Sequence, residues 1–211
     1  MKKIYSLLFL LAVTSVMISC DKNDDQQNDP QNPTDGFTIS GVFHEAPNCY
    51  IEFDTDANPT EFNLFFTDGR MYDNDTNING SSGDYLFSTT MKNWVFYNIR
   101  DIENPSIVNP TYPNIQTGVQ YVGNAGDSVI TYNLVVSSLS PPFISNNIEF
   151  GMVSSGTVKI PGVSGPFLTI NSYSFDSSTQ TGTINVDYSF IDASGQTILG
   201  HYEGSLGVLL D

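Results

Sequence analysis

Basic residues and alanine are both scarce in this sequence. The 211 residues include 7 lysines and arginines against 23 acidic residues, which gives a formal net charge of −16. A surface of this charge repels phosphate backbones, so the composition excludes nucleic acid as a partner. After residue 20 there are only four alanines, whereas Thr, Ser, Asn, Gly, Tyr and Phe are frequent. This composition favours strands and turns over helices.

The first residues have the layout of a secretory signal peptide. Lys2 and Lys3 precede an apolar run from Ile4 to Ile18. The run is about fifteen residues long, shorter than the ~20 residues that a membrane-spanning helix needs. It therefore predicts targeting of the chain rather than a membrane span.

The apolar run ends in Met17-Ile18-Ser19-Cys20, which resembles the lipobox of bacterial lipoproteins. The resemblance implies that residues 1–19 are removed as a signal peptide and that Cys20 becomes the lipid attachment site. Two or more acyl chains anchor a protein stably to a membrane. The alternative is a plain secretory signal in which Cys20 is incidental. Because a lipidated Cys20 leaves Cys49 without an intrachain partner, a disulfide framework is excluded and Cys49 is predicted to be a small core residue.

Residues 20–36 are predicted to form a disordered tether behind the lipidated cysteine. From Asp21 to Gly36 the chain has no aromatic side chain and no aliphatic one apart from proline rings. The acidic run directly after Cys20 resembles the surface-export signal of Bacteroidota lipoproteins. The resemblance implies an outer-membrane lipoprotein at the cell surface, and a lipoprotein facing the periplasm is the alternative.

Residues 37–211 are predicted to form a single all-β domain, an antiparallel β-sandwich or partly open β-barrel of eight to ten strands. Period-two alternation from Phe37 to His44 predicts one strand. Asn93–Ile99 is apolar on both faces, which predicts a strand in the middle of the sheet. The last fifty residues, with Thr181–Phe190 and the Gly200–Ser205 segment, are similar to the C-terminal β-meander of Bacteroidota lipoproteins.

Several local signals predict irregularities in the strands. Asp68-Gly69 predicts a tight hairpin, and Ser140-Pro141-Pro142 predicts a strand break. The apolar residues change face within 167–175, which predicts a bulge near Asn171-Ser172. Gly200 and Gly204 predict bends or bulges in the last strand.

The sequence contains no convincing catalytic motif. His44 and His201 are both expected on strands, as surface or hydrogen-bonded residues without a nucleophile motif. Glu52, Asp54 and Asp56 share one strand face, which loosely resembles the E-x-D-x-x-E strand of β-sandwich glycosidases. The last glutamate of that motif is replaced by Ala57, so the acid residue is missing.

The segment Asp75-Thr76-Asn77-Ile78-Asn79-Gly80 matches the opening D-x-N-x-N-G of a calcium loop. Asp73, Asp75, Asn77 and Asn79 are the candidate oxygen ligands, and the glycine permits the sharp turn. The twelfth position is Leu86, where a bidentate acid is required. The competing interpretation is a hairpin turn with a polar loop. No other cofactor is predicted.

Exposed tyrosines are the candidates for ligand binding. Tyr112 and Tyr121 lie in a proline-rich excursion and are predicted to offer a stacking surface to a glycan or protein ligand, whereas Trp94 is predicted to lie in the core. Asp127-Ser128-Val129 resembles an O-glycosylation acceptor of Bacteroidota. The leading interpretation is a non-catalytic cell-envelope lipoprotein with a binding or structural β-module. A carbohydrate-active enzyme is the alternative.

The lipid anchor generates a direct prediction. Cys20→Ser removes the thiol that is acylated, so the protein should lose its acyl mass and move from the membrane fraction to the soluble fraction. Mass spectrometry and sedimentation measure both effects, and Cys49→Ser serves as the matched control that should remain acylated. A Cys20→Ser protein that still sediments with membranes would contradict the anchor.

Overall fold

The computed structural model describes residues 34–53, 61–100, 115–159 and 165–209. The predicted signal peptide, Cys20 and most of the tether lie outside these residues. No helix in the described ranges has the length and apolarity to span a membrane. A single 3-10 turn, η1, covers Ile78–Gly80. The strands are β1 (Gly36–Ile39), β2 (Val42–Glu45), β3 (Asn48–Phe53), β4 (Phe62–Thr67), β5 (Met71–Asp73), β6 (Tyr85–Ser88), β7 (Trp94–Ile99), β8 (Gln120–Val122), β9 (Val129–Ser145), β10 (Ile148–Lys159), β11 (Phe167–Asp176), β12 (Thr181–Ile191) and β13 (Thr197–Val208).

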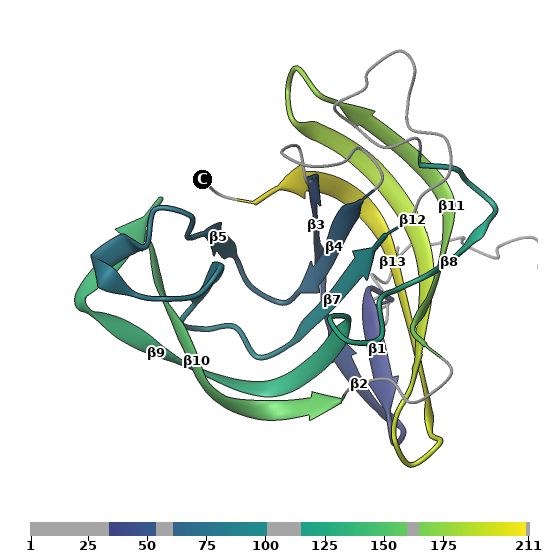
Figure 1. The fold of residues 1–211 in the computed structure, drawn as a ribbon, viewed down its shortest axis with the longest axis horizontal. Helices are drawn as coiled ribbons and strands as arrows, with labels where there is room; N and C mark the ends of the chain where they lie inside the picture. Colours follow the sequence, from purple (N-terminus) through teal and green to yellow (C-terminus); the bar gives the residue numbers. More distant parts are fainter. Residues whose placement is uncertain (1–33, 54–60, 101–114, 160–164, 210–211) are drawn as a thin grey trace, which may run out of the picture. The chain divides into compact units, whose positions relative to one another are not determined.

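The predicted all-β fold is confirmed, and its strands form one open sheet (Figure 1). The sheet has thirteen strands in the order β5-β6-β10-β9-β7-β4-β3-β13-β12-β11-β8, with β1 on β13 and β2 on β1. The predicted eight to ten strands were too few, in part because the three-residue strands β5 and β8 also join the sheet. Among the described strands, β3 and β13 are the one parallel pair.

The folded domain begins slightly earlier than the predicted boundary at Phe37. β1 starts at Gly36. The Ala46 N–H donates to the Asp35 carbonyl at 2.8 Å, and the Glu203 N–H donates to the Asp35 carboxylate at 2.9 Å. Asp35 and Gly36 therefore belong to the domain rather than to the tether.

The segment from Phe37 to His44 forms two strands, so the prediction of one strand was wrong. Ser40 and Gly41 have φ angles of 51° and 78°, and Ile39 pairs with Val42. Two consecutive residues with positive φ make the tight turn of a two-residue hairpin. The reversal puts Phe43 opposite Thr38, on the other sheet face from Phe37, and Phe43 becomes exposed.

The central strands β3, β4 and β7 lie between two hydrophobic cores. One face packs in a core with β1, β11, β12 and β13, and the other face packs in a core with β5, β6 and β9. On β7, Val95 and Tyr97 enter the first core, whereas Trp94 and Phe96 pack against the second. The predicted central position of this strand is confirmed, and Trp94, which was predicted to lie in the core, is partly buried against the second core.

The predicted hairpin at Asp68-Gly69 is wrong, because β4 pairs with β7 and β5 pairs with β6. The Asp68 carboxylate instead accepts hydrogen bonds from the N–H groups of Lys92 and Asn93, both at 2.9 Å. Burial raises the pKa of Asp68, and these hydrogen bonds act against the rise. Asp68 thus fixes the chain where it leaves β4 beside the start of β7.

The predicted strand break at Ser140-Pro141-Pro142 is also wrong. β9 continues through the prolines, and its register with β10 jumps from Ser138 opposite Gly151 to Phe143 opposite Phe150. Proline lacks the N–H that a sheet ladder needs, so it is tolerated where pairing is interrupted. The prolines therefore lie in an irregularity within one long hairpin.

The bulge near Asn171-Ser172 is confirmed, because the register with β12 shifts between Ile170 and Ser172. The predicted alternative of a bulge at Gly200 or Gly204 is wrong for the β12–β13 ladder, since the two strands pair without interruption past both glycines. Gly200 instead makes room for an aromatic ring: a Cβ placed there would lie 2.1 Å from Cε2 of Tyr188. Packing of the Tyr188 ring therefore requires a residue without a side chain at position 200.

This contact predicts that Gly200→Ala destabilises the domain by about 1–3 kcal/mol, because overpacking forces ring and backbone to shift. Gly207→Ala is the matched control on the same strand, since a Cβ at Gly207 meets nothing within 4 Å. Urea unfolding followed by fluorescence measures both free energies of unfolding. Equal midpoints for the two variants would contradict the steric role of Gly200.

Candidate functional site

A shallow hollow of about 290 Å³ lies between the β1–β2 hairpin and the strands β12 and β13. Its apolar part is formed by Phe43 and Leu199, and its polar part by Thr38, Asp187 and His201. Strand register explains this grouping, because Phe43 faces Thr38 across β1 and β2, and Thr38 faces Leu199 across β1 and β13. The hollow is thus a feature of paired strands rather than of a loop.

The apolar part of the hollow is open to solvent. Phe43 is 38% exposed and Leu199 is 63% exposed. Phe43 reaches this face only because the Ser40-Gly41 turn reverses the chain after Ile39. Large exposed apolar side chains grouped beside polar groups are typical of a binding surface.

Asp187 and His201 of the polar part belong to a hydrogen-bonded row of three side chains, which Asn171 of β11 continues beyond the lining of the hollow. His201 Nδ1 lies 2.7 Å from Asp187 Oδ1, and Asn171 Nδ2 donates to Asp187 Oδ2 at 2.8 Å. Asn171 is the extra residue of the bulge, and its Nδ2 also donates to Asn185 Oδ1 at 2.8 Å. The bulge therefore positions a side chain that holds the Asp187 carboxylate.

Both partners favour the charged form of Asp187. The hydrogen bond from Asn171, followed by that from His201, lowers the pKa of Asp187. An ionised Asp187 fixes the His201 ring by holding Nδ1. His201 Nε2 has no hydrogen-bond partner among the described residues, so it is available to a ligand hydroxyl.

The hollow contains a carboxylate and imidazole pair beside its apolar surface. Asp187 and His201 form an oriented acid and imidazole pair, the kind that activates a nucleophile in hydrolases. The hydroxyl side chains of the described lining are those of Thr34 and Thr38. What the hollow offers is an apolar surface bordered by hydrogen-bonding groups.

Glu52, the described member of the predicted carboxylate row, is held by two hydrogen-bond donors. Asn63 Nδ2 and the Tyr85 hydroxyl each donate to Glu52 Oε2 at 2.7 Å. Burial, followed by the charge of Glu52, raises the pKa of Tyr85, so the phenol remains a donor. Asp54 and Asp56 lie outside the described residues. Glu52 therefore has a clear structural role at the edge of the second core.

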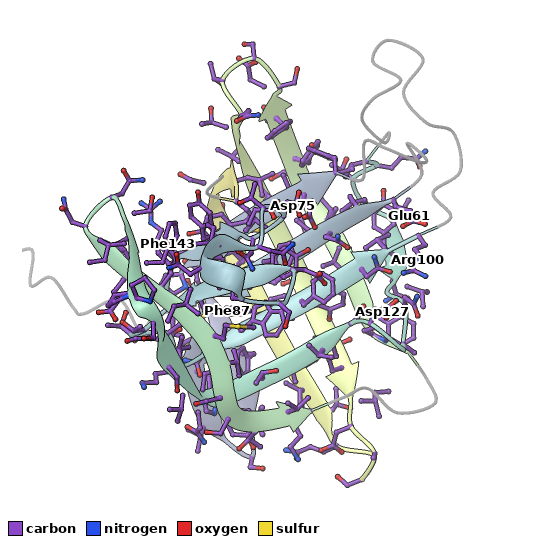
Figure 2. All side chains as sticks on the ribbon, turned by 60° about the vertical axis from the view of Figure 1, so that its left-hand side comes forward. Glu61, Asp75, Phe87, Arg100, Asp127 and Phe143 are labelled. Atoms are coloured by element: carbon purple, nitrogen blue, oxygen red, sulfur yellow. The ribbon has the colours of Figure 1, made fainter. Side chains whose placement is uncertain are left out.

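The calcium-loop candidates lie in the connection between β5 and β6, where Asp75 is exposed (Figure 2). Asn77 and Asn79 have φ angles of 49° and 53°. The buried Asn74 holds the loop: its Nδ2 donates to Ser81 Oγ and to the Gly83 carbonyl, both at 3.0 Å. No group of three or more acidic, histidine or cysteine residues in the described chain is placed to hold a metal ion. The polar-loop interpretation explains this conformation, and calcium binding stays a prediction.

Asp73 is electrostatically unusual within this loop. Its Oδ1 accepts a hydrogen bond from the Asp75 N–H at 3.1 Å. Burial, followed by the Asp75 carboxyl and the charge of Glu52, raises the pKa of Asp73 to about 6. Burial and the neighbouring carboxyl groups thus disfavour the ionised form of Asp73.

Of the two tyrosines predicted to bind ligands, the structure describes Tyr121. Tyr112 lies outside the described residues. The Tyr121 hydroxyl accepts from the Gln116 N–H at 2.7 Å and donates to the Gln116 carbonyl at 3.2 Å. Its ring packs edge-on against Phe62 with centroids 5.7 Å apart. Tyr121 therefore serves mainly to hold its own loop against the first core.

The predicted glycosylation acceptor, Ser128, is fully buried. Its Oγ accepts a hydrogen bond from the Asn98 N–H at 3.1 Å. A buried hydroxyl is inaccessible to a glycan, so this prediction is wrong for the folded domain. Next to it, Arg100 pairs with Asp127 at 2.9 Å and with Glu61 at 3.7 Å (Figure 2).

The other singled-out residues have structural roles. Cys49 is buried, as predicted, and burial raises the pKa of its thiol well above the ordinary value. His44 stacks on Phe37 with centroids 5.1 Å apart and contacts Tyr132 at 4.8 Å. Its ring is thus part of the packing under the β1–β2 hairpin.

Sequence reasoning missed the residues of the hollow. Phe43 was assigned to the wrong face because the turn was not recognised, although the small Ser40-Gly41 pair was a turn signal. Asn171 was found as a bulge residue, but its partner Asp187 requires cross-strand register. Comparison of the chain with family models, curated proteins and solved structures found no match.

The raised pKa of Asp73 predicts a pH-dependent stability. Because the folded-state pKa of about 6 exceeds the unfolded value of 3.8, ionised Asp73 disfavours folding above pH 6, and this cost disappears below the unfolded value. Asp73→Asn should therefore stabilise the domain at pH 7.5, by about 0.5–1 kcal/mol after solvent screening, and should be neutral at pH 3.5. Thermal unfolding at both pH values measures the difference. A carboxyl pKa near 4 by NMR titration would contradict the argument.

Proposed function

We propose that this protein is a lipid-anchored cell-envelope protein, exposed at the outer-membrane surface, whose β-domain binds glycans without catalysis. The observation that supports this proposal is the hollow beside β13, where exposed Phe43 and Leu199 adjoin the Asn171-Asp187-His201 row. The lipobox-like Cys20 and the polar tether support the envelope location.

A sugar ring is complementary to a hollow that has an apolar part and a hydrogen-bonding part side by side. One face of a pyranose carries C–H groups that pack on an aromatic ring, and its edge carries hydroxyls that need donors and acceptors. Phe43 provides the ring, whereas His201 Nε2 and the Thr38 hydroxyl provide hydrogen-bonding groups at the edge. The hollow is shallow, so affinity for one sugar should be weak and should grow when several copies on a surface bind one polymer.

A carbohydrate-active enzyme is the second candidate, and one observation favours it. Glycosidases need one carboxyl with a raised pKa as the acid and one ionised carboxylate. The pKa of Asp73 is raised to about 6, with Glu52 close enough to contribute to the rise. Glu52 is occupied by Asn63 and Tyr85, which favours the binding function.

The binding function predicts a loss of glycan affinity when the apolar surface is removed. Phe43→Ala should weaken binding of the glycans identified on an array by at least about tenfold, because a lost stacking contact is worth about 1.4 kcal/mol or more. Val42→Ala is the matched control: Val42 is 58% exposed on the same strand but does not line the hollow. Thermal shift and titration calorimetry, each with and without calcium, measure binding.

The outcomes separate the candidates. In the thermal-shift measurement, a glycan that binds and is present at one hundred times its Kd should stabilise the protein by about 2.7 kcal/mol. Equal weakening by Phe43→Ala and Val42→Ala, or no glycan bound at all, would refute binding at this hollow. Glycan cleavage that is lost in Asp73→Asn would instead support the enzyme.

A further inference from the structure

A second hollow, of about 200 Å³, lies where β3 runs parallel to β13. Its polar lining is formed by Asn48, Tyr50, Arg70 and Ser205. Gly207 contributes no side chain, and a Cβ placed there would meet nothing within 4 Å. Gly207 pairs with Tyr50 in the strand register, so the missing side chain leaves the space beside Tyr50 open.

Arg70 is the unusual residue of this hollow. Among the described residues Arg100 and Lys159 form ion pairs, and Lys92 Nζ donates to the Leu134 carbonyl. Within the described chain, the exposed Arg70 guanidinium forms neither an ion pair nor a hydrogen bond. A guanidinium that no described carboxylate neutralises attracts an anion at close range, even though the net charge of −16 repels anions from the protein as a whole.

The neighbours of Arg70 also suit an anion. Tyr50 and Arg70 line the same hollow, and although burial raises the pKa of Tyr50, the charge of Arg70 acts against the rise. That hydroxyl has no hydrogen-bond partner among the described residues, so it is a free donor. The described lining contains no aspartate or glutamate that would repel a negative ligand.

We propose that this hollow is a carboxylate-binding site and that its ligand is an acidic sugar. The planar guanidinium of Arg70 binds the two oxygens of a carboxylate in parallel, and the Tyr50 hydroxyl donates to one of them. The hollow is smaller than the roughly 300–1,000 Å³ of pockets that enclose a drug-sized molecule, so it holds one acidic sugar unit. This site is separate from the hollow at Phe43, and the inference stands whether or not that hollow binds glycans.

The test is titration calorimetry on the full-length protein in detergent, with sodium glucuronate as the probe. D-Glucose is the matched neutral control, because it differs by a hydroxymethyl group in place of the carboxylate. We expect glucuronate to bind at least about tenfold more tightly than glucose, since a charge-assisted bidentate pair is worth over 1.4 kcal/mol. The affinity should fall in high salt, because Arg70 is exposed to solvent.

Variants assign the effect to Arg70. Arg70→Gln should weaken glucuronate binding at least tenfold, and Arg70→Lys should give an intermediate loss because it keeps the charge without the planar fork. Arg100→Gln removes the other described arginine, which lies in its own ion pairs, and should bind as the unaltered protein does. Phe43→Ala should also leave this affinity unchanged, which separates the two sites.

Several outcomes would overturn the proposal. Glucose binding as tight as glucuronate, or an Arg70→Gln protein with unchanged affinity, would exclude a carboxylate contact at Arg70. Sulfate binding more tightly than glucuronate would refute the carboxylate as the preferred anion. No binding of any of the three probes, with an unaltered circular dichroism spectrum, would refute the site.

Discussion

The burial of both faces of β3, β4 and β7 is the constraint on which the rest of the structure depends. Strands with two apolar faces need cover on both sides. Other strands of the same sheet provide this cover. β5, β6 and β9 pack over one face of the central strands, and β11, β12 and β13 pack over the other. Tyr97 fixes this arrangement across the first core, where its hydroxyl donates to the carbonyls of Ser189 at 2.9 Å and Phe167 at 3.1 Å.

Local irregularities in the covering strands create the surface features. A regular strand from Phe37 to His44 would bury Phe43, and the Ser40-Gly41 turn exposes it instead. The bulge in β11 allows the Asn171 side chain to reach Asp187, which a regular strand would not allow. The packed core therefore sets where β12 and β13 lie, and the departures from regularity set which side chains they present.

The sequence predicts the core better than the surface. Period-two alternation identified the two-faced β7, the buried Cys49 and the bulge at Asn171, because each depends on the identity of nearby residues. The pairing of β4 with β7 instead of β5 depends on Asp68 reaching Lys92 and Asn93, and no local pattern encodes that contact. The hollow has the same origin, since it combines residues more than 150 positions apart in the chain.

The two hollows along β13 differ in the sign of their charge, and the difference follows from the pairing partners of that strand. Where β13 pairs with β12, His201 faces the ionised Asp187, so this end repels anions and suits neutral hydroxyls. Where β13 pairs with β3, the cation that lines the hollow is Arg70, and no carboxylate occurs among the described lining residues. A strongly acidic protein repels anions from most of its surface, whereas the planar fork of a guanidinium is complementary to those anions that accept two parallel hydrogen bonds.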